Sequence, residues 1–176
     1  MMFRGSRFVH NNQKGITLLE LIIAIAIAAL ITAGITAAIM QILTINHRAS
    51  NHMVVVRQVQ QAGKEVSKDT LQSQNVTYSE SSGFNLTLAW KNIEGLQNLV
   101  SYTISPANEL SRSHSVNGTP VATAPPIVAE YMDPDQTNCV WNATKRVLIF
   151  TVTAALGTES ETRIYEIEPR PSPPSS

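Results

Sequence analysis

The chain of 176 residues contains a single cysteine, Cys139. One cysteine excludes a disulfide bond within the chain, so packing alone must hold any folded domain together. A lone thiol is either a small buried hydrophobic group or a bridge to another molecule. We expect Cys139 to be buried.

Proline is absent before Pro106, so nothing ahead of that residue must interrupt a helix. Within this stretch, residues 21–45 form an apolar run of roughly 25 residues. As a helix the run spans roughly 37 Å, which crosses a hydrocarbon core of about 30 Å with some tilt. We therefore expect a transmembrane helix near the N-terminus. The run is interrupted only by Thr32, Gly34, Thr36, Gln41 and Thr44.

Acidic residues are absent before Glu20, whereas Arg4, Arg7 and Lys14 are basic. Because basic flanks stay in the cytoplasm, we expect a cytoplasmic N-terminus and an outer location for the rest of the chain. A cleaved secretory signal has an apolar region of about 7–15 residues, which is shorter than this run. An unprocessed signal anchor joined to an unrelated outer domain fits the length but leaves Glu20 unexplained.

Glu20 is an acid at the start of a membrane-length apolar run. A carboxylate costs about 2.5–3.5 kcal/mol near the bilayer centre and less at the edge, so it indicates a function and a partner. If the chain is cut after Gly15, the new α-amine of Ile16 is a cation with a pKa of about 7.7–8.0. The helix cannot bring this amine to its own Glu20, but a neighbouring copy shifted along the axis can. Such pairing favours a filament of stacked helix ends.

Residues 15–20, Gly-Ile-Thr-Leu-Leu-Glu, follow the basic leader. This junction resembles the class III prepilin signal of type IV pilins and type II secretion pseudopilins, with Ile16 where that family commonly has Phe. The resemblance implies that a prepilin peptidase cuts between Gly15 and Ile16 and methylates the Ile16 amine. It also implies an assembly role for Glu20.

By the same resemblance, the chain is a structural subunit of a type II secretion pseudopilus or a type IV pilus. Its expected partners are the peptidase, other pilins or pseudopilins, an inner-membrane assembly platform and membrane lipid. Its expected location is the bacterial inner membrane, which it crosses once. The alternative is a tip-located adhesin or substrate-binding module on the same anchor, which exposed aromatic residues between Arg112 and Asn142 would favour.

Several patterns outside the apolar run are similar to those of J-type minor pseudopilins and PilW-type minor pilins, which implies a minor subunit near the tip. K-type tip pseudopilins lack the acid that Glu20 supplies, so we do not expect that subgroup. The patterns are an arginine-and-acid stretch at 57–69, Tyr102 followed by Leu110-Ser111-Arg112, the apolar segment 147–152 and Arg163-Ile164-Tyr165.

The fold expected from element order is α+β: one long helix followed by an antiparallel meander, which is also the pilin-like ladle that the resemblance implies. The helix should run from Ile16 to Leu71 or Gln74, because Val55, Val59, Ala62 and Val66 share one helical face. The expected organisation is a leader at 1–15, a membrane helix at 16–45, a globular domain at 46–168 and a disordered Pro/Ser-rich tail at 169–176.

Alternating or β-branched segments predict strands at 84–90, 99–104, 127–132, 147–153 and 163–167. Segment 112–126 contains Pro120, Pro125 and Pro126, and we expect it to be a long loop.

The composition argues against most other functions. The intact chain has 13 basic and 13 acidic residues, and loss of three basic leader residues leaves a net charge of about −3. No nucleic-acid surface is therefore expected. No catalytic triad spacing or phosphate loop is present, so we expect no enzyme activity, no catalytic residues and no cofactor.

Metal binding is also not expected. His47 and His52 are five residues apart and point to different helix faces. Segment 133–138 resembles a calcium loop, but it lacks the glycine at the sixth position and has Thr144 at the twelfth, where such loops carry glutamate. We expect a polar turn there, and we expect Trp90 and Trp141 to be core or sheet-face residues.

Overall fold

The computed structural model describes residues 15–79, 84–122 and 126–171. The chain divides into two compact units, Met1–Ile45 and Asn46–Ser176. A single helix, α1 (Leu18–Gln72), begins in the first unit and ends in the second. The helix ends at Gln72, between the predicted ends at Leu71 and Gln74. There the amide of Ser73 donates to the carbonyls of Asp69 and Thr70.

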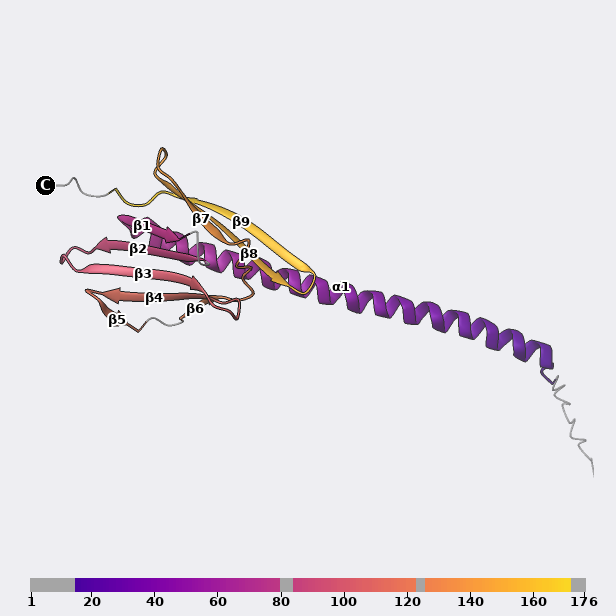
Figure 1. Ribbon diagram of the computed structural model, residues 1–176. Coiled ribbons are helices and arrows are strands. Elements are labelled where there is room, and N and C mark those ends of the chain that lie inside the picture. The colour runs from indigo at the N-terminus through magenta and orange to yellow at the C-terminus, as the bar shows by residue number, and fades with distance from the viewer. Residues whose placement is uncertain (1–14, 80–83, 123–125, 172–176) are drawn as a thin grey trace, which may run out of the picture. The chain divides into compact units, whose positions relative to one another are not determined.

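Within the residues that the structure describes, nine strands follow the helix, and every strand pair is antiparallel (Figure 1). The arrangement is α+β, with the helix packed against antiparallel sheets, as predicted. The first sheet has the order β1-β2-β3-β4-β5, with β6 also paired to β4, and the second has the order β7-β8-β9. The strands are β1 (Asn75–Ser79), β2 (Asn85–Lys91), β3 (Gln97–Ile104), β4 (Leu110–Val116), β5 (Thr119–Val121), β6 (Ile127–Ala129), β7 (Asn138–Asn142), β8 (Val147–Leu156) and β9 (Glu159–Ile167).

The predicted loop at 112–126 is wrong. Most of β4 and all of β5 lie there, joined by Asn117 and Gly118, whose φ angles are 50° and 80°. An Asn-Gly pair with positive φ at both positions is the favoured two-residue hairpin turn, and the prolines hid this signal. Pro120 is tolerated because β5 is an edge strand, which does not need every backbone donor.

The strand prediction also missed β1 and β7, which are five residues long and contain little apolar alternation. The strand expected at 127–132 is confirmed only over β6, and Met132 forms an isolated bridge with Ala154. The strands form two sheets where a single meander was expected. Residues 169–176 were expected to be disordered, but Pro169 is buried, and residues 172–176 lie outside the described part of the chain.

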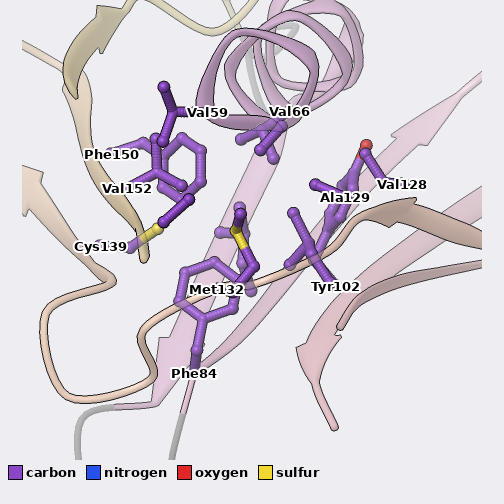
Figure 2. Packing of buried hydrophobic residues seen from close by; sticks show 14 of the residues in the cluster. Val59, Val66, Phe84, Tyr102, Val128, Ala129, Met132, Cys139, Phe150 and Val152 are labelled. Atoms are coloured by element: carbon purple, nitrogen blue, oxygen red, sulfur yellow. The ribbon is translucent and has the colours of Figure 1, made fainter. Parts of the chain in front are cut away.

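The core of the second unit lies between α1 and the inner faces of both sheets. The predicted helix face is confirmed, because Val55, Val59, Ala62 and Val66 are fully buried. Figure 2 shows Val59 and Val66 beside Phe150 and Val152 of β8. Full burial of side chains of this size contributes about 1.5–3 kcal/mol each. The other large, fully buried side chains are Tyr102, Leu86, Leu88, Leu110, Met132, Leu148 and Val100.

A buried ionic cluster joins the end of α1 to the first sheet. Asp69 is only 2% exposed. Its carboxylate accepts hydrogen bonds from the Tyr102 hydroxyl on β3 and from Arg112 on β4, whose Nε and Nη2 lie 2.7 and 3.2 Å from the two carboxylate oxygens. Burial and the bond to Asp69 raise the pKa of Tyr102, so the phenol stays protonated and donates. The hydrogen bond to Asp69 raises the pKa of Arg112.

Replacing Asp69 by alanine should lower the free energy of unfolding by about 3–5 kcal/mol, because the half-buried Arg112 loses its counter-ion. The measurement is urea unfolding of the full chain in detergent micelles, followed by tryptophan fluorescence. The matched control is Lys68→Ala, which removes an exposed pair with Glu65 at 3.7 Å and should cost less than about 0.5 kcal/mol. Equal midpoints for the two variants would contradict the importance of the cluster.

A close approach between α1 and β9 depends on Gly63. A Cβ at this position would overlap the ring of Tyr165, whose hydroxyl donates to the carbonyl of Val59 at 3.2 Å. A larger residue at 63 would therefore push β9 away from the helix.

Gly63→Ala should destabilise the chain by about 1–3 kcal/mol in the same urea assay. At an uncrowded helix site the same change raises the free energy of unfolding by about 1 kcal/mol. The sign of the change in the free energy of unfolding therefore shows whether position 63 is crowded. A second substitution, Tyr165→Ala, should remove most of the penalty of Gly63→Ala. A stabilised Gly63→Ala chain would show that the contact is not close.

Candidate functional site

The predicted processing and assembly residues lie together at the start of α1. Gly15, Ile16 and Thr17 precede the helix, and Glu20 lies in its first turn. The Thr17 hydroxyl accepts the amide of Glu20 at 3.3 Å, and the Thr17 carbonyl accepts the amide of Leu21 at 3.2 Å. Thr17 is therefore the N-cap of the helix. The Thr-x-x-Glu spacing of a capping box is visible in the sequence and could have predicted this role.

Gly15 has no packing reason to be glycine. A Cβ built at this position meets no atom within 4 Å among the described residues. The described part of the fold therefore leaves room for a larger residue at this position.

Glu20 is exposed, and it forms no ion pair within the described ranges. Its place in the first turn is favourable for an anion, because the helix N-terminus carries partial positive charge. That local interaction does not neutralise a carboxylate beside an apolar surface. The side chain is therefore available to a cation from outside the chain.

Every residue from Gly15 to Ser50 is exposed in the isolated chain. This part of α1 is long and apolar enough to cross a membrane. Within it, the hydroxyls of Thr32, Thr36 and Thr44 donate to carbonyls four residues earlier, at 2.8, 2.9 and 2.9 Å. These hydroxyls are satisfied without water, as a lipid environment or a packed helical bundle requires.

The candidate metal sites considered from the sequence are the histidines of α1 and the polar segment after β6. No group of three His, Cys, Asp or Glu residues within the described residues could hold a metal ion. The His47 ring lies 3.3 Å from the amide of Asn51. The Asp133 carboxylate accepts bonds from the backbone of Asp135 and from both the backbone and side chain of Gln136. That carboxylate therefore organises its own turn.

Both tryptophans are half-buried. Trp90 lies on the first sheet and stacks on His114, with ring centroids 6.2 Å apart. Trp141 lies on β7 and lines a small cavity. The prediction that they are sheet-face residues is confirmed by their positions on β2 and β7.

Cys139 is 6% exposed, as predicted, and burial raises its pKa to about 12. The native thiol should therefore remain protonated and react slowly with iodoacetamide from pH 7 to 10. In denaturant the reaction should be fast, with half its limiting rate near pH 8.5. Below about pH 8.5 the thiol is protonated in the folded and the unfolded chain, so the free energy of unfolding does not depend on it; between about pH 8.5 and 12 only the unfolded chain ionises, and the free energy of unfolding falls as the pH rises. A native alkylation rate equal to the denatured rate would contradict burial; Cys139→Ser is the unreactive control.

Residues 10–36 match the family model of the prokaryotic N-terminal methylation motif. The match covers the junction from Gly15 to Glu20 and the first part of the apolar helix. Comparisons with curated proteins and with solved structures found no match.

Proposed function

We propose that this chain, which carries the N-terminal methylation motif of the type IV pilin and pseudopilin family, is a processed filament subunit. The motif and the apolar helix support a membrane-anchored, pilin-like subunit. We further propose that it is a minor subunit of a type II secretion pseudopilus or a type IV pilus. In that role the chain is structural and carries out no reaction.

The observation that carries the proposal is the capped junction at the start of α1. The helix begins at Leu18, so a cut after Gly15 would leave the amine of Ile16 just ahead of the first turn. The Glu20 carboxylate lies in that turn without an ion pair within the described residues. A second subunit, shifted along the helix axis, would bring its own amine to this carboxylate. Methylation would leave the amine positively charged.

The apolar surface of α1 explains why the paired charges matter. In lipid or in a helical bundle, an unpaired charge costs several kcal/mol, whereas a paired one is compensated. Subunits that align amine to carboxylate are therefore favoured over other registers. The proposed organisation follows: a cytoplasmic leader at 1–15, a membrane and filament-core helix at 16–45 and an outer domain at 46–168.

The ionic cluster supports the narrower proposal of a J-type or PilW-type minor subunit. Tyr102 and Arg112 belong to the strand patterns that resemble those subgroups, and Asp69 ends the helical stretch that does. All three side chains meet in one buried cluster. The helical pattern and the two strand patterns therefore supply the side chains of one buried ionic cluster.

Glu20→Ala should leave processing unchanged and abolish co-purification with filaments, because the neighbouring amine loses its counter-ion. The measurement is the amount of the chain in sheared filaments or in cross-linked assemblies from the native host. Glu65→Ala, which changes an acid in the outer part of α1, is the matched control and should assemble normally.

Gly15→Leu provides the reference for the processing step. Its intact mass should include residues 1–15, whereas the wild-type and Glu20→Ala chains should begin at a methylated Ile16. A wild-type chain that keeps its leader would overturn the proposal. Normal assembly of Glu20→Ala would overturn the charge pairing alone.

A further inference from the structure

Two edge strands of the second unit line the same two cavities. β1 is the first strand of its sheet, and among the described residues it pairs only with β2 while β7 pairs only with β8. One cavity, of about 220 Å³, is lined by Asn75 and Val76 of β1 and by Trp141 of β7. A second, of about 450 Å³, is lined by Ser79 of β1 and by residues 138–140 of β7. The two strands therefore approach each other at two separate cavities, one toward each end of β1, and they lie near each other in Figure 1.

The smaller cavity is positively charged. Arg146, in the turn before β8, and Arg170, after β9, both line it, and its lining contains no acid. Neither guanidinium forms an ion pair with a carboxylate of the described residues. Glu168 is close in sequence but is exposed and is not part of the lining.

An edge strand offers unpaired backbone donors and acceptors along its length, and an extended peptide can pair with them. Guanidinium groups bind carboxylates through paired, charge-assisted hydrogen bonds. Trp141 and the buried Pro169 also line this cavity. A strand edge beside two unpaired arginines thus fits a ligand that is both extended and acidic.

We propose that β1 binds an extended acidic segment of another protein, which adds to its free edge and places one carboxylate between Arg146 and Arg170. The size of the cavity suits a single glutamate or aspartate side chain. The site lies entirely within Asn46–Ser176 and does not involve Ile16 or Glu20. It would give the chain a capacity to recognise a partner in addition to assembly.

The experiment uses the full chain in detergent micelles and measures binding by tryptophan fluorescence and calorimetry. The ligand is a capped octapeptide of alternating Thr and Glu. A Thr/Gln octapeptide tests charge, the same Thr/Glu peptide N-methylated at alternate amides tests strand pairing, and an oligogalacturonate of equal charge tests an acidic polysaccharide instead. We expect saturable one-to-one binding of the Thr/Glu peptide, weakened by salt, and at least tenfold weaker binding of the other three ligands.

Arg146→Gly and Arg170→Gln should each weaken binding of the Thr/Glu peptide about tenfold. Arg146 has a φ of 54°, a conformation that favours glycine, so Arg146→Gly should fold at least as stably as the wild type. Arg57→Gln, on an exposed position of α1, is the matched control and should bind normally. The proposal is overturned if no peptide binds, or if a chain carrying both Arg146→Gly and Arg170→Gln binds the Thr/Glu peptide as tightly as the wild type does. It is also overturned if the N-methylated peptide binds as tightly as the unmethylated one, or if only the polysaccharide binds.

Discussion

The second unit depends on one buried carboxylate at the end of its helix. Asp69 is almost fully removed from water, yet it receives three donors from two neighbouring strands. Desolvation of a charge is tolerated only when such partners replace the lost water. Because the partners come from β3 and β4, the cluster fixes the first sheet against α1 in one position. The valine face of the helix alone could slide, since hydrophobic contacts have little directionality.

One continuous helix serves two different environments. Over its C-terminal part it buries a narrow stripe of valine and alanine side chains, and Gly63 lets β9 lie close to its backbone. Over its first part it presents apolar side chains on all sides, and its threonine hydroxyls are satisfied by its own carbonyls. The sequence changes from all-round apolar to amphipathic between these parts, as a passage from lipid to water requires.

The helix and most strands could be predicted because their signals are local. The valine spacing, the missing prolines and the alternation around Leu86 and Leu88 each depend on a few neighbouring residues. The split into two sheets and the short strands β1 and β7 could not be predicted from local patterns. They depend on pairing between segments that the sequence pattern does not connect. For the same reason Asp69 and Arg112 were noticed only as parts of separate patterns. The N-terminal methylation motif at residues 10–36 was predictable from the sequence, whereas the N-cap Thr17 was visible in the Thr-x-x-Glu spacing and was missed.

The position of Thr17 bears on how the proposed leader would be removed. Proteases act on extended chains, and a peptide bond inside a helix must first lose its hydrogen bonds to be cut. Here the bond between Gly15 and Ile16 precedes the first helical turn, and the Thr17 hydroxyl holds that turn closed. Removal of the leader would therefore require no unwinding of α1. The membrane-spanning segment would keep its full length and register before and after the cut.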